Sequence, residues 1–374
     1  MFDNSINGER IKQARIYRGL SQAQLADKLN VTKQAISKYE TNKMNLNIST
    51  IALLPKALGF PLSFFNNHKK INNDNDIVFF RTKDIPKKTQ AQLREKINVM
   101  ETEVIEYFEN YIEFPNLNIP DFSDLLLDET CNYNRENIIE VCKRLREYWG
   151  IENEPIDNLM YILQVNGFII NKQYIDQNKT DGFSKNLNDK AIIFVSANKE
   201  SAVRTRFDLA HELGHLVLHR NIEIEELGEK SIEMDADFFA SEFLYPRDEF
   251  IKEIQNSPLN FELFIRLKEK WKISIQAIIR KCKDFNLISE EKYIYFQKRI
   301  SYNGWRKKEP LDERIIEEEP RLLKDIIELL NDNNVLSKKT LLREINLDKE
   351  EFVKLCNLPI DFFDDTLENL IKIY

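Results

Sequence analysis

Apolar residues recur at helical spacing along most of this chain, and short continuous apolar runs interrupt the pattern near its middle. Apolar positions three or four residues apart predict helices over residues 22–29, 33–40, 87–113, 137–149 and 156–165. Two apolar runs bounded by polar turns, one starting at Gly167 and one spanning Ala191–Val195, are typical of buried strands. We therefore expect an α+β fold that is predominantly helical and contains a small sheet.

Two short helices near the N-terminus are separated by a tight turn. The hydroxyls of Ser21 and Thr32 can accept hydrogen bonds from backbone N–H groups, so these residues are expected to cap the helices 22–29 and 33–40. Asn30 stands where the chain needs a left-handed residue, a conformation that Asn tolerates. Two helices joined in this way form a helix-turn-helix, whose second helix enters the major groove of DNA. A small helical bundle with a solvated basic face would show the same spacing.

The second of these helices presents polar side chains that are suited to DNA. Gln can pair with adenine through two hydrogen bonds, Lys can pair with guanine, and Ser can bind a base or a phosphate. Backbone N–H groups at the start of the preceding helix favour a phosphate. The predicted DNA contacts are Gln22, Thr32, Lys33, Gln34, Ser37 and Lys38.

The same segment carries a family resemblance. It resembles the helix-turn-helix of the Cro/C1 (XRE) repressor family through the motif Ser21-Gln22-x-x-Leu25-Ala26-x-x-Leu29-x-Val31-Thr32-x-x-x-Ile36-Ser37-x-Tyr39-Glu40. The likeness extends over residues 8–66, and Asn30 replaces the Gly that is commonest in the turn. The resemblance implies an all-α DNA-binding domain with a double-stranded DNA operator as its partner.

Charge is distributed unevenly along the 374 residues. The chain has 54 Lys and Arg against 62 Asp and Glu, a formal charge of −8, which taken alone argues against a nucleic-acid partner. The first 70 residues, however, contain 11 basic and 4 acidic residues, a net charge of +7, and the remainder has a net charge of −15. A small basic module therefore precedes a larger acidic body, and only the module is suited to DNA.

Composition excludes several other classes of protein. With 42% hydrophobic residues the chain can form buried cores and is not expected to be disordered. No run approaches the roughly 18 apolar residues of a membrane span, and the N-terminus lacks the basic and apolar regions of a secretory signal. We expect a cytoplasmic protein without membrane contact, with reduced thiols at the scattered cysteines Cys131, Cys142, Cys282 and Cys356.

Three of the four histidines lie close together and form a metal-binding pattern. His211-Glu212-Leu213-Gly214-His215 is an H-E-x-x-H motif. On a helix, His211 and His215 lie one turn apart on the same face and can bind one Zn²⁺ at about 2.0–2.1 Å. Glu212 is rotated by about 100° from His211, which places it beside the metal as a general base for water. The motif predicts zinc-dependent hydrolysis.

A catalytic zinc needs a third protein ligand and one open position. The next predicted helix offers Glu233, Asp235 and Asp237. Glu233 and Asp237 share a face, so we predict that Glu233 is the third ligand. Asp237 is expected to accept a hydrogen bond from a ligand histidine and to fix its tautomer. Asp235 remains the alternative ligand, and His219 is interpreted as a packing or hydrogen-bonding residue rather than a ligand.

A structural zinc site and a metal-free histidine cluster are the competing interpretations of this motif. Structural zinc sites usually use cysteine and close all four positions, whereas no cysteine lies near the motif. Glu212 between the two histidines also favours catalysis. The strand Ala191–Val195 precedes the motif helix and is expected to offer an edge on which a peptide substrate could add as an extra strand.

The metal motif has a family resemblance of its own. It resembles the ImmA/IrrE family of zinc metallopeptidases through Arg204-x-Arg206-Phe207-x-Leu209-Ala210-His211-Glu212-x-Gly214-His215 and Ala236-x-x-Phe239-Ala240-x-x-x-Leu244-x-Pro246. The likeness covers residues 75–310 and departs at Asp237, where Asn is frequent, and at Tyr245, where Met is usual. The resemblance implies a zincin-like domain that cleaves repressors of the Cro/C1 type, in other molecules or in its own chain.

We therefore expect four segments, namely a helix-turn-helix domain at 1–66, a linker at 67–86, a zinc metallopeptidase domain at 87–310 and a helical C-terminal tail at 311–374. The tail is interpreted as a solvated interaction or dimerisation module, which leaves a homodimer open. The expected function is a DNA-binding transcriptional regulator that carries an endopeptidase. The competing hypothesis is a regulator whose peptidase-like domain is a sensor or dimerisation scaffold without proteolysis.

Overall fold

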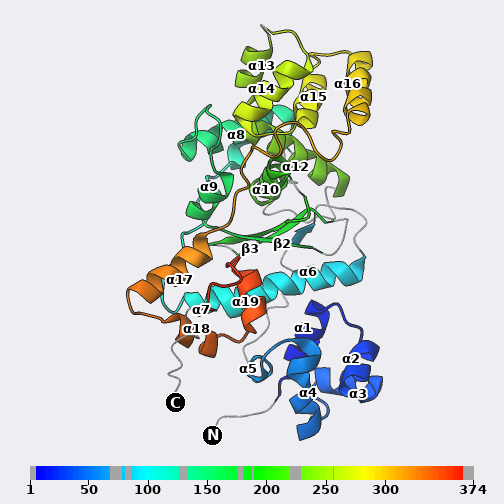
Figure 1. Cartoon of the computed structure of the whole chain (residues 1–374), viewed down its shortest axis with the longest axis vertical. Helices are drawn as coiled ribbons and strands as arrows, with labels where there is room; N and C mark the ends of the chain where they lie inside the picture. Colours follow the sequence, from blue (N-terminus) through cyan, green and yellow to red (C-terminus); the bar gives the residue numbers. More distant parts are fainter. Residues whose placement is uncertain are drawn as a thin grey trace, which may run out of the picture. The chain divides into compact units, whose positions relative to one another are not determined.

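The chain forms two compact units in the computed structural model (Figure 1). The described residues are 6–67, 78–80, 86–125, 133–175, 180–187, 189–199, 201–219, 229–255 and 257–364. Unit 1 comprises residues 1–76, 84–114 and 321–374, and unit 2 comprises residues 77–83 and 115–320. The N-terminal helices and the C-terminal helices therefore belong to the same unit.

The expectations about membranes and cysteines can be checked over the described residues. No helix there is both long and apolar enough to cross a membrane. Cys142, Cys282 and Cys356 are buried thiols without a disulfide, and burial raises the pKa of each of them. Cys131 lies outside the described residues.

Unit 1 is built from helices throughout its described part. Its elements are α1 (Gly8–Tyr17), α2 (Gln22–Leu29), α3 (Lys33–Glu40), α4 (Ile48–Leu58), α5 (Leu62–Phe65), α6 (Lys87–Val99), a π-helical stretch (Met100–Ile105), α7 (Glu106–Phe108), α17 (Leu322–Asp332), α18 (Lys338–Glu344) and α19 (Lys349–Leu355). The bounds of α2 and α3 match the prediction. The long helix predicted over 87–113 is present as α6, the π-helical stretch and α7 in succession.

Side-chain caps explain why α2 and α3 begin and end where they do. Ser21 Oγ and Thr32 Oγ1 each accept a backbone N–H three residues further on, both at 3.2 Å. Asn30 ends α2 in the left-handed conformation, with φ of 53°. Leu25 and Ile36 are fully buried between the helices. The predicted helix-turn-helix is therefore present.

Buried polar contacts hold α1 against later parts of unit 1. Arg10 forms an ion pair with Glu103 of the π-helical stretch, with 2.8 Å between Nη1 and Oε1 and both side chains almost fully buried. The Tyr17 hydroxyl and the Arg18 guanidinium both donate to the carboxylate of Glu351 in α19, the latter at 2.6 Å. Removing one partner of such a buried pair leaves an uncompensated charge, at a cost of roughly 3–5 kcal/mol. Helix α19 and the α6 region therefore fold together with the helix-turn-helix.

The division into units differs from the segments expected from the sequence. Of the expected peptidase domain, 87–310, the part up to residue 114 belongs to unit 1. The expected tail, 311–374, is divided between the two units at residue 320. An amphipathic stripe shows that a helix has a buried face but does not show which element covers that face. Glu103, which pairs with Arg10 of α1, lies 93 residues away in the sequence.

Unit 2 contains a small sheet and a larger set of helices, of which α9 and α10 pack against the strands. Its elements are β1 (Val78–Phe80), a 3-10 turn (Ser123–Leu125), α8 (Arg135–Tyr148), α9 (Leu159–Val165), β2 (Phe168–Gln173), β3 (Gly182–Asn186), β4 (Ala191–Ser196), α10 (Ala202–Leu218), α12 (Glu229–Leu244), α13 (Arg247–Ile254), α14 (Phe261–Trp271), α15 (Ile275–Asp284) and α16 (Glu290–Tyr302). The strand order is β1-β3-β4-β2, with β2 parallel to β4 and β3 antiparallel to both of its neighbours. The expected fold, α+β and predominantly helical, is confirmed.

Strand β4 is central in the sheet, so the expectation that Ala191–Val195 offers a free edge is wrong. β4 pairs with β2 on one side and with β3 on the other, and all of its residues are buried. Strands covered on both faces read as continuous apolar runs, which is why β2 and β4 were predictable. β3 has the mixed sequence Gly-Phe-Ser-Lys-Asn and gives no such signal.

Helices α10 and α12 pack against each other beside the sheet (Figure 1). α10 is buried on almost all sides, as expected for a helix in the core of a domain. The two helices approach closely at Gly214, where an added Cβ would lie 3.1 Å from the Phe239 ring and 3.2 Å from Ala236 Cα. This approach brings the H-E-x-x-H motif next to the acidic residues of α12.

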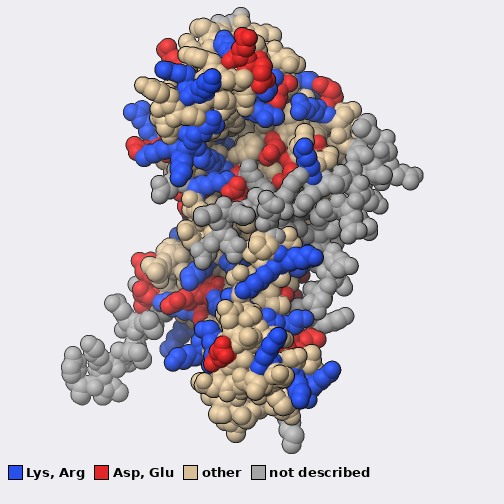
Figure 2. Space-filling view, turned by 90° about the vertical axis from the view of Figure 1, so that its right-hand side faces the viewer, with Lys and Arg blue, Asp and Glu red and all other residues tan. Residues whose placement is uncertain are grey.

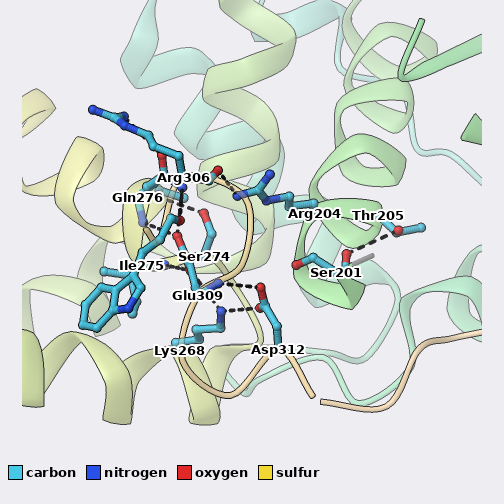
Figure 3. Close-up of polar contacts among 12 residues, drawn as sticks. Ser201, Arg204, Thr205, Lys268, Ser274, Ile275, Gln276, Arg306, Glu309 and Asp312 are labelled. Carbon is cyan, nitrogen blue, oxygen red and sulfur yellow. Dashed lines mark hydrogen bonds and ion pairs between the residues drawn. The ribbon is translucent and has the colours of Figure 1, made fainter. Parts of the chain in front are cut away.

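A buried polar cluster fixes the segment that follows α16 (Figure 3). The Glu309 carboxylate accepts the backbone N–H groups of Ile275 and Gln276, at 2.7 and 3.1 Å, at the start of α15. The Lys268 ammonium lies 2.9 Å from Glu309 and 2.5 Å from Asp312. A carboxylate at this position satisfies orphan N–H groups and favours the positive end of the helix dipole.

The acidic run after this cluster contacts other elements of unit 2 through Glu317, Glu318 and Glu319, so the expectation of a solvated tail is wrong for Glu318. The Glu318 side chain is 9% exposed and pairs with the Arg206 guanidinium, and it accepts the Met160 backbone N–H at 3.0 Å. Lys172 pairs with Glu317 at 3.0 Å and with Glu319 at 2.6 Å. The acidic residues therefore neutralise buried cations of their own chain.

Candidate functional site

The H-E-x-x-H motif lies within α10, where helical geometry brings His211 and His215 together. Their Nε2 atoms are 3.1 Å apart, and the rings meet edge to face with 4.7 Å between centroids. Each histidine is only 1% exposed. Two imidazole nitrogens therefore converge on one point inside unit 2.

Glu233 of α12 completes a set of three donor atoms. Its Oε2 lies 3.5 Å from His211 Nε2, and its Oε1 lies 3.4 Å from His215 Nε2. Ligand atoms of the three residues all lie within 4.8 Å of one another. A tetrahedral zinc with bonds of about 2.0–2.2 Å keeps its ligand atoms roughly 3.3–3.6 Å apart. The two distances from Glu233 fall in this range, and the two imidazole nitrogens, 3.1 Å apart, lie slightly below it. The two imidazoles and the carboxylate are the ligand types that suit zinc, and three protein ligands leave a fourth position for a reactant.

Asp237 and Asp235 occupy different places on α12. Asp237 Oδ1 lies 2.8 Å from His211 Nδ1, and a carboxylate on the second ring nitrogen orients the ring and fixes its tautomer. Asp235 is not part of the three-residue group. Burial raises the pKa of the Asp235 carboxyl to about 6, in spite of the opposing effect of Arg135. The geometry favours Glu233 over Asp235 as the third ligand.

His219 follows the last turn of α10 and contacts the back of His215. The two Nδ1 atoms are 3.1 Å apart, so one nitrogen donates a hydrogen bond and the other accepts it. This contact uses the nitrogen of His215 that faces away from Glu233. His219 is therefore placed as a hydrogen-bond partner of His215, outside the three-residue group.

The carboxylate of Glu212 is completely buried and faces strand β3. The Ser184 hydroxyl donates a hydrogen bond to Glu212 Oε2 at 2.7 Å. Gly182 lies on the same face of β3, because alternate residues of a strand share a face, and a Cβ there would come within 2.7 Å of Glu212 Oε1. β3 thus orients this carboxylate and leaves space for it.

The contacts of Glu212 with β3 could not be predicted from the sequence. Ser184 precedes its partner by 28 residues, and neither Ser184 nor Gly182 belongs to a recognisable motif. The only available signal was the position of a glycine and a serine two residues apart between two buried strands, which is too common a pattern to predict a contact with the Glu212 carboxylate.

Burial and hydrogen bonding set the charge states in the centre. Desolvation lowers the pKa of His215 to about 4 and lowers that of His219 well below its ordinary range. Burial alone would raise the pKa of Glu233, but hydrogen bonds from His211 and His215 bring it down to about 2. At neutral pH His215 is therefore neutral and Glu233 is ionised, which are the protonation states that bind a metal ion.

The predicted DNA contacts separate into an exposed set and a residue turned toward the protein. The exposed set on α3 and its cap, here called the reader surface, consists of Thr32, Lys33, Gln34, Ser37 and Lys38. Gln22 is half-buried, and its Nε2 donates to Glu40 Oε2 at 2.8 Å. Arg15 donates to the same carboxylate. In the lower part of Figure 2, Lys and Arg side chains are scattered over a mostly uncharged surface.

Family models match the region of the N-terminal helices and the region of the candidate metal centre. Residues 11–65 match a family model described as Helix-turn-helix, and residues 167–283 match a peptidase-family model described as IrrE N-terminal-like domain. The chain is also 39% identical over 57 residues to the SPbeta prophage-derived uncharacterized HTH-type transcriptional regulator YonR of Bacillus subtilis (strain 168). That match covers 15% of the chain and 53% of the relative, so the chain spans about half the length of the protein it matches. Both motif-based resemblances are confirmed.

Proposed function

From the premise that this chain joins a helix-turn-helix domain to an IrrE-like peptidase-family domain, we propose that it is a cytoplasmic transcriptional regulator with a zinc-dependent endopeptidase activity. The reader surface of α3 binds a double-stranded DNA operator, and the centre between α10 and α12 cleaves protein. The observation that carries the proposal is the convergence of His211, His215 and Glu233, in a helix pair whose H-E-x-x-H motif also supplies the buried carboxylate of Glu212.

The chemistry follows from the residues around the centre. His211, His215 and Glu233 would hold Zn²⁺, which when bound supplies a Lewis acid that polarises a peptide carbonyl and acidifies water. Glu212 accepts the proton of the attacking water as its oxygen bonds to the carbonyl carbon. The same carboxyl then delivers this proton to the leaving amine nitrogen as the C–N bond breaks.

Neighbouring side chains keep these groups in place. Asp237 holds the His211 ring through its second nitrogen, and His219 contacts the second nitrogen of His215. Ser184 fixes the direction of the Glu212 carboxylate. Each acting group is thus oriented by a contact from its own or another element, which is the preorganisation that catalysis in a buried site requires.

The substrate we propose is a helix-turn-helix repressor, either another protein or a copy of this chain. The support is the resemblance of the metal motif to repressor-cleaving peptidases and the presence of a helix-turn-helix domain on the chain itself. An endopeptidase fused to a DNA-binding domain can be concentrated on the operators where such repressors bind. Residues 67–86 of the chain provide a further candidate for the cut.

Metal analysis paired with mass spectrometry tests this function. The purified chain should contain stoichiometric zinc and should cut a helix-turn-helix repressor at one site, and a chelator should stop the cleavage. Operator affinity, measured in parallel, should fall steeply with salt concentration because phosphate contacts release counterions. If the zinc-loaded chain binds an operator but cuts neither candidate repressors nor itself, the endopeptidase is contradicted and a sensor or dimerisation scaffold is favoured.

A further inference from the structure

A segment that follows the DNA-binding helices in sequence forms a strand of the sheet in unit 2. β1 (Val78–Phe80) pairs antiparallel with β3, and Phe79 lies opposite Ser184 in the register. In the strand order β1-β3-β4-β2 it occupies the outer position beside β3 among the described residues. The chain between its two domains thus reaches the strand that holds Glu212.

β3 links this outer position to the candidate catalytic base. Ser184 donates to Glu212 Oε2 at 2.7 Å, and Gly182 leaves space for Glu212 Oε1. Neighbouring strands in a sheet run about 4.8 Å apart. The backbone of β1 therefore lies about that far from the backbone of β3, the strand whose Ser184 contacts Glu212. The other neighbour of β3 is β4, which is itself covered by β2.

Without β1, the outer side of β3 would present a row of unsatisfied backbone N–H and C=O groups. Such an edge binds extended polypeptide by adding it to the sheet as a further strand. The proposed activity requires a stretch of protein substrate to lie beside Glu212 in an extended form. A substrate strand added to β3 and the strand β1 would occupy the same place.

We propose that β1 is an intramolecular competitor that occupies the β3 edge until an extended segment of protein substrate replaces it. The inference rests on the proposed function only in that the segment replacing β1 is then cleaved. β1 suits this role because its ladder is three residues long and, among the described residues, it is paired on one side only. A longer strand makes more hydrogen bonds to β3 and displaces it.

Peptide binding to the full-length chain tests this competition. The probe is a fluorescent peptide with the sequence of residues 76–83, and all proteins carry Glu212→Gln so that nothing is cut. The variant Phe79→Pro/Phe80→Pro opens the edge. Successive N–H groups of a strand point to opposite sides, so two adjacent prolines remove a hydrogen bond toward β3 whichever residue donates it. The control Phe79→Val/Phe80→Val keeps both N–H groups and favours a strand.

The proline variant should bind the peptide at least about tenfold more tightly than the parent and the valine control, because a tethered competitor acts at an effective concentration on the order of millimolar. Equal affinity for the proline variant and the parent would overturn the proposal. Binding to none of the proteins would overturn it as well. A peptide carrying the same two prolines serves as the negative probe and should not bind.

A disulfide provides a second measurement that does not depend on how the proline variant folds. Val78 and Lys185 are direct partners in the register, so Val78→Cys/Lys185→Cys can lock β1 on β3. Peptide binding should be lost on oxidation and return on reduction, and equal binding in both states would contradict the competition. Absence of proteolysis by the wild-type chain would overturn the proposed function but would leave these binding results unaffected.

Discussion

In the candidate metal centre, contacts inside the protein hold the side chains in place, whereas the side chains of the reader surface are exposed to solvent. His211, His215 and Glu212 are buried, and the ring or carboxylate of each contacts a side chain from α10, α12 or β3. The residues of the reader surface are exposed along one helix. Buried polar groups must be satisfied by the fold, whereas exposed side chains take their final positions when a ligand binds. The fold therefore defines the geometry of the proposed metal ligands more sharply than that of the proposed base contacts.

The largest effect is expected at Glu233, the proposed third ligand. Glu233→Gln removes the carboxylate that faces both histidines. Its zinc affinity should fall by more than the roughly 10–100-fold that loss of an outer hydrogen bond costs. Asp235→Asn, two residues away on α12, is the matched control and should keep wild-type affinity. Competition with a chelator measures both, and the reverse result would make Asp235 the ligand.

A smaller effect is expected when the support of a ligand is removed. Asp237→Ala takes away the carboxylate 2.8 Å from His211 Nδ1. Zinc affinity should fall by about 10–100-fold because the ring loses its fixed orientation and tautomer. Asp237→Asn, which keeps an oxygen that can accept the N–H of the ring, should recover most of this loss. Unchanged affinity in Asp237→Ala would show that helix packing alone orients His211.

Acid should destabilise the zinc-free protein through the buried centre. An unfolded histidine takes up a proton near pH 6.5, whereas His215 in the folded chain does so only near pH 4. Between these values the unfolded state binds more protons, so the free energy of unfolding falls as the pH falls. The loss from pH 7 to pH 5 is about 2 kcal/mol from His215, at roughly 1.4 kcal/mol per pKa unit.

Urea unfolding of chelator-treated protein at pH 7, 6 and 5 measures this effect. His219, whose pKa is also lowered by burial, contributes in the same direction. The variant His215→Gln lacks the titrating group and should lose less stability over the same range. Asp235, whose pKa is raised to about 6, takes up its proton in the folded state over this range and acts in the opposite direction. A wild-type loss no larger than that of His215→Gln would therefore contradict the buried, neutral state of His215.

The smallest effect is expected on the reader surface, where the substitution removes a single proposed contact with a base. Gln34→Ala should reduce the preference for the operator over random DNA by about tenfold, as expected for one lost glutamine–base pairing. Gln24→Ala is the matched control, because Gln24 is exposed on α2 and its side chain already accepts the Ser21 N–H. Binding titrations against both DNAs measure the ratio. An unchanged ratio in Gln34→Ala would remove this residue from base recognition.

Local signals accounted for the parts of the molecule that were predictable. The hydroxyl caps and the left-handed Asn30 define α2 and α3 from a few neighbouring residues. The continuous apolar runs define β2 and β4 because strands covered on both faces exclude polar residues. His211 and His215 meet because any α-helix brings positions four apart onto one face. None of these features requires knowledge of the rest of the fold.

Long-range pairings accounted for the parts that were not predictable. The position of β4 within the sheet depends on β3, whose sequence gives no strand signal. The α6 region belongs to unit 1, where Arg10 of α1 pairs with Glu103, a residue 93 positions away in the sequence. The docking of Glu318 depends on Arg206 in α10. Charged residues in amphipathic or acidic stretches look solvated until the partner that buries them is known.

The variant Glu212→Gln shows whether the proposed zinc centre is catalytic and whether Glu212 is its base. The substitution keeps the size of the side chain and should leave zinc content and operator binding unchanged. Cleavage of a helix-turn-helix repressor, followed by mass spectrometry at equal zinc loading, should slow by about 10²–10⁴-fold. Cleavage at the wild-type rate by the zinc-loaded variant would contradict the account.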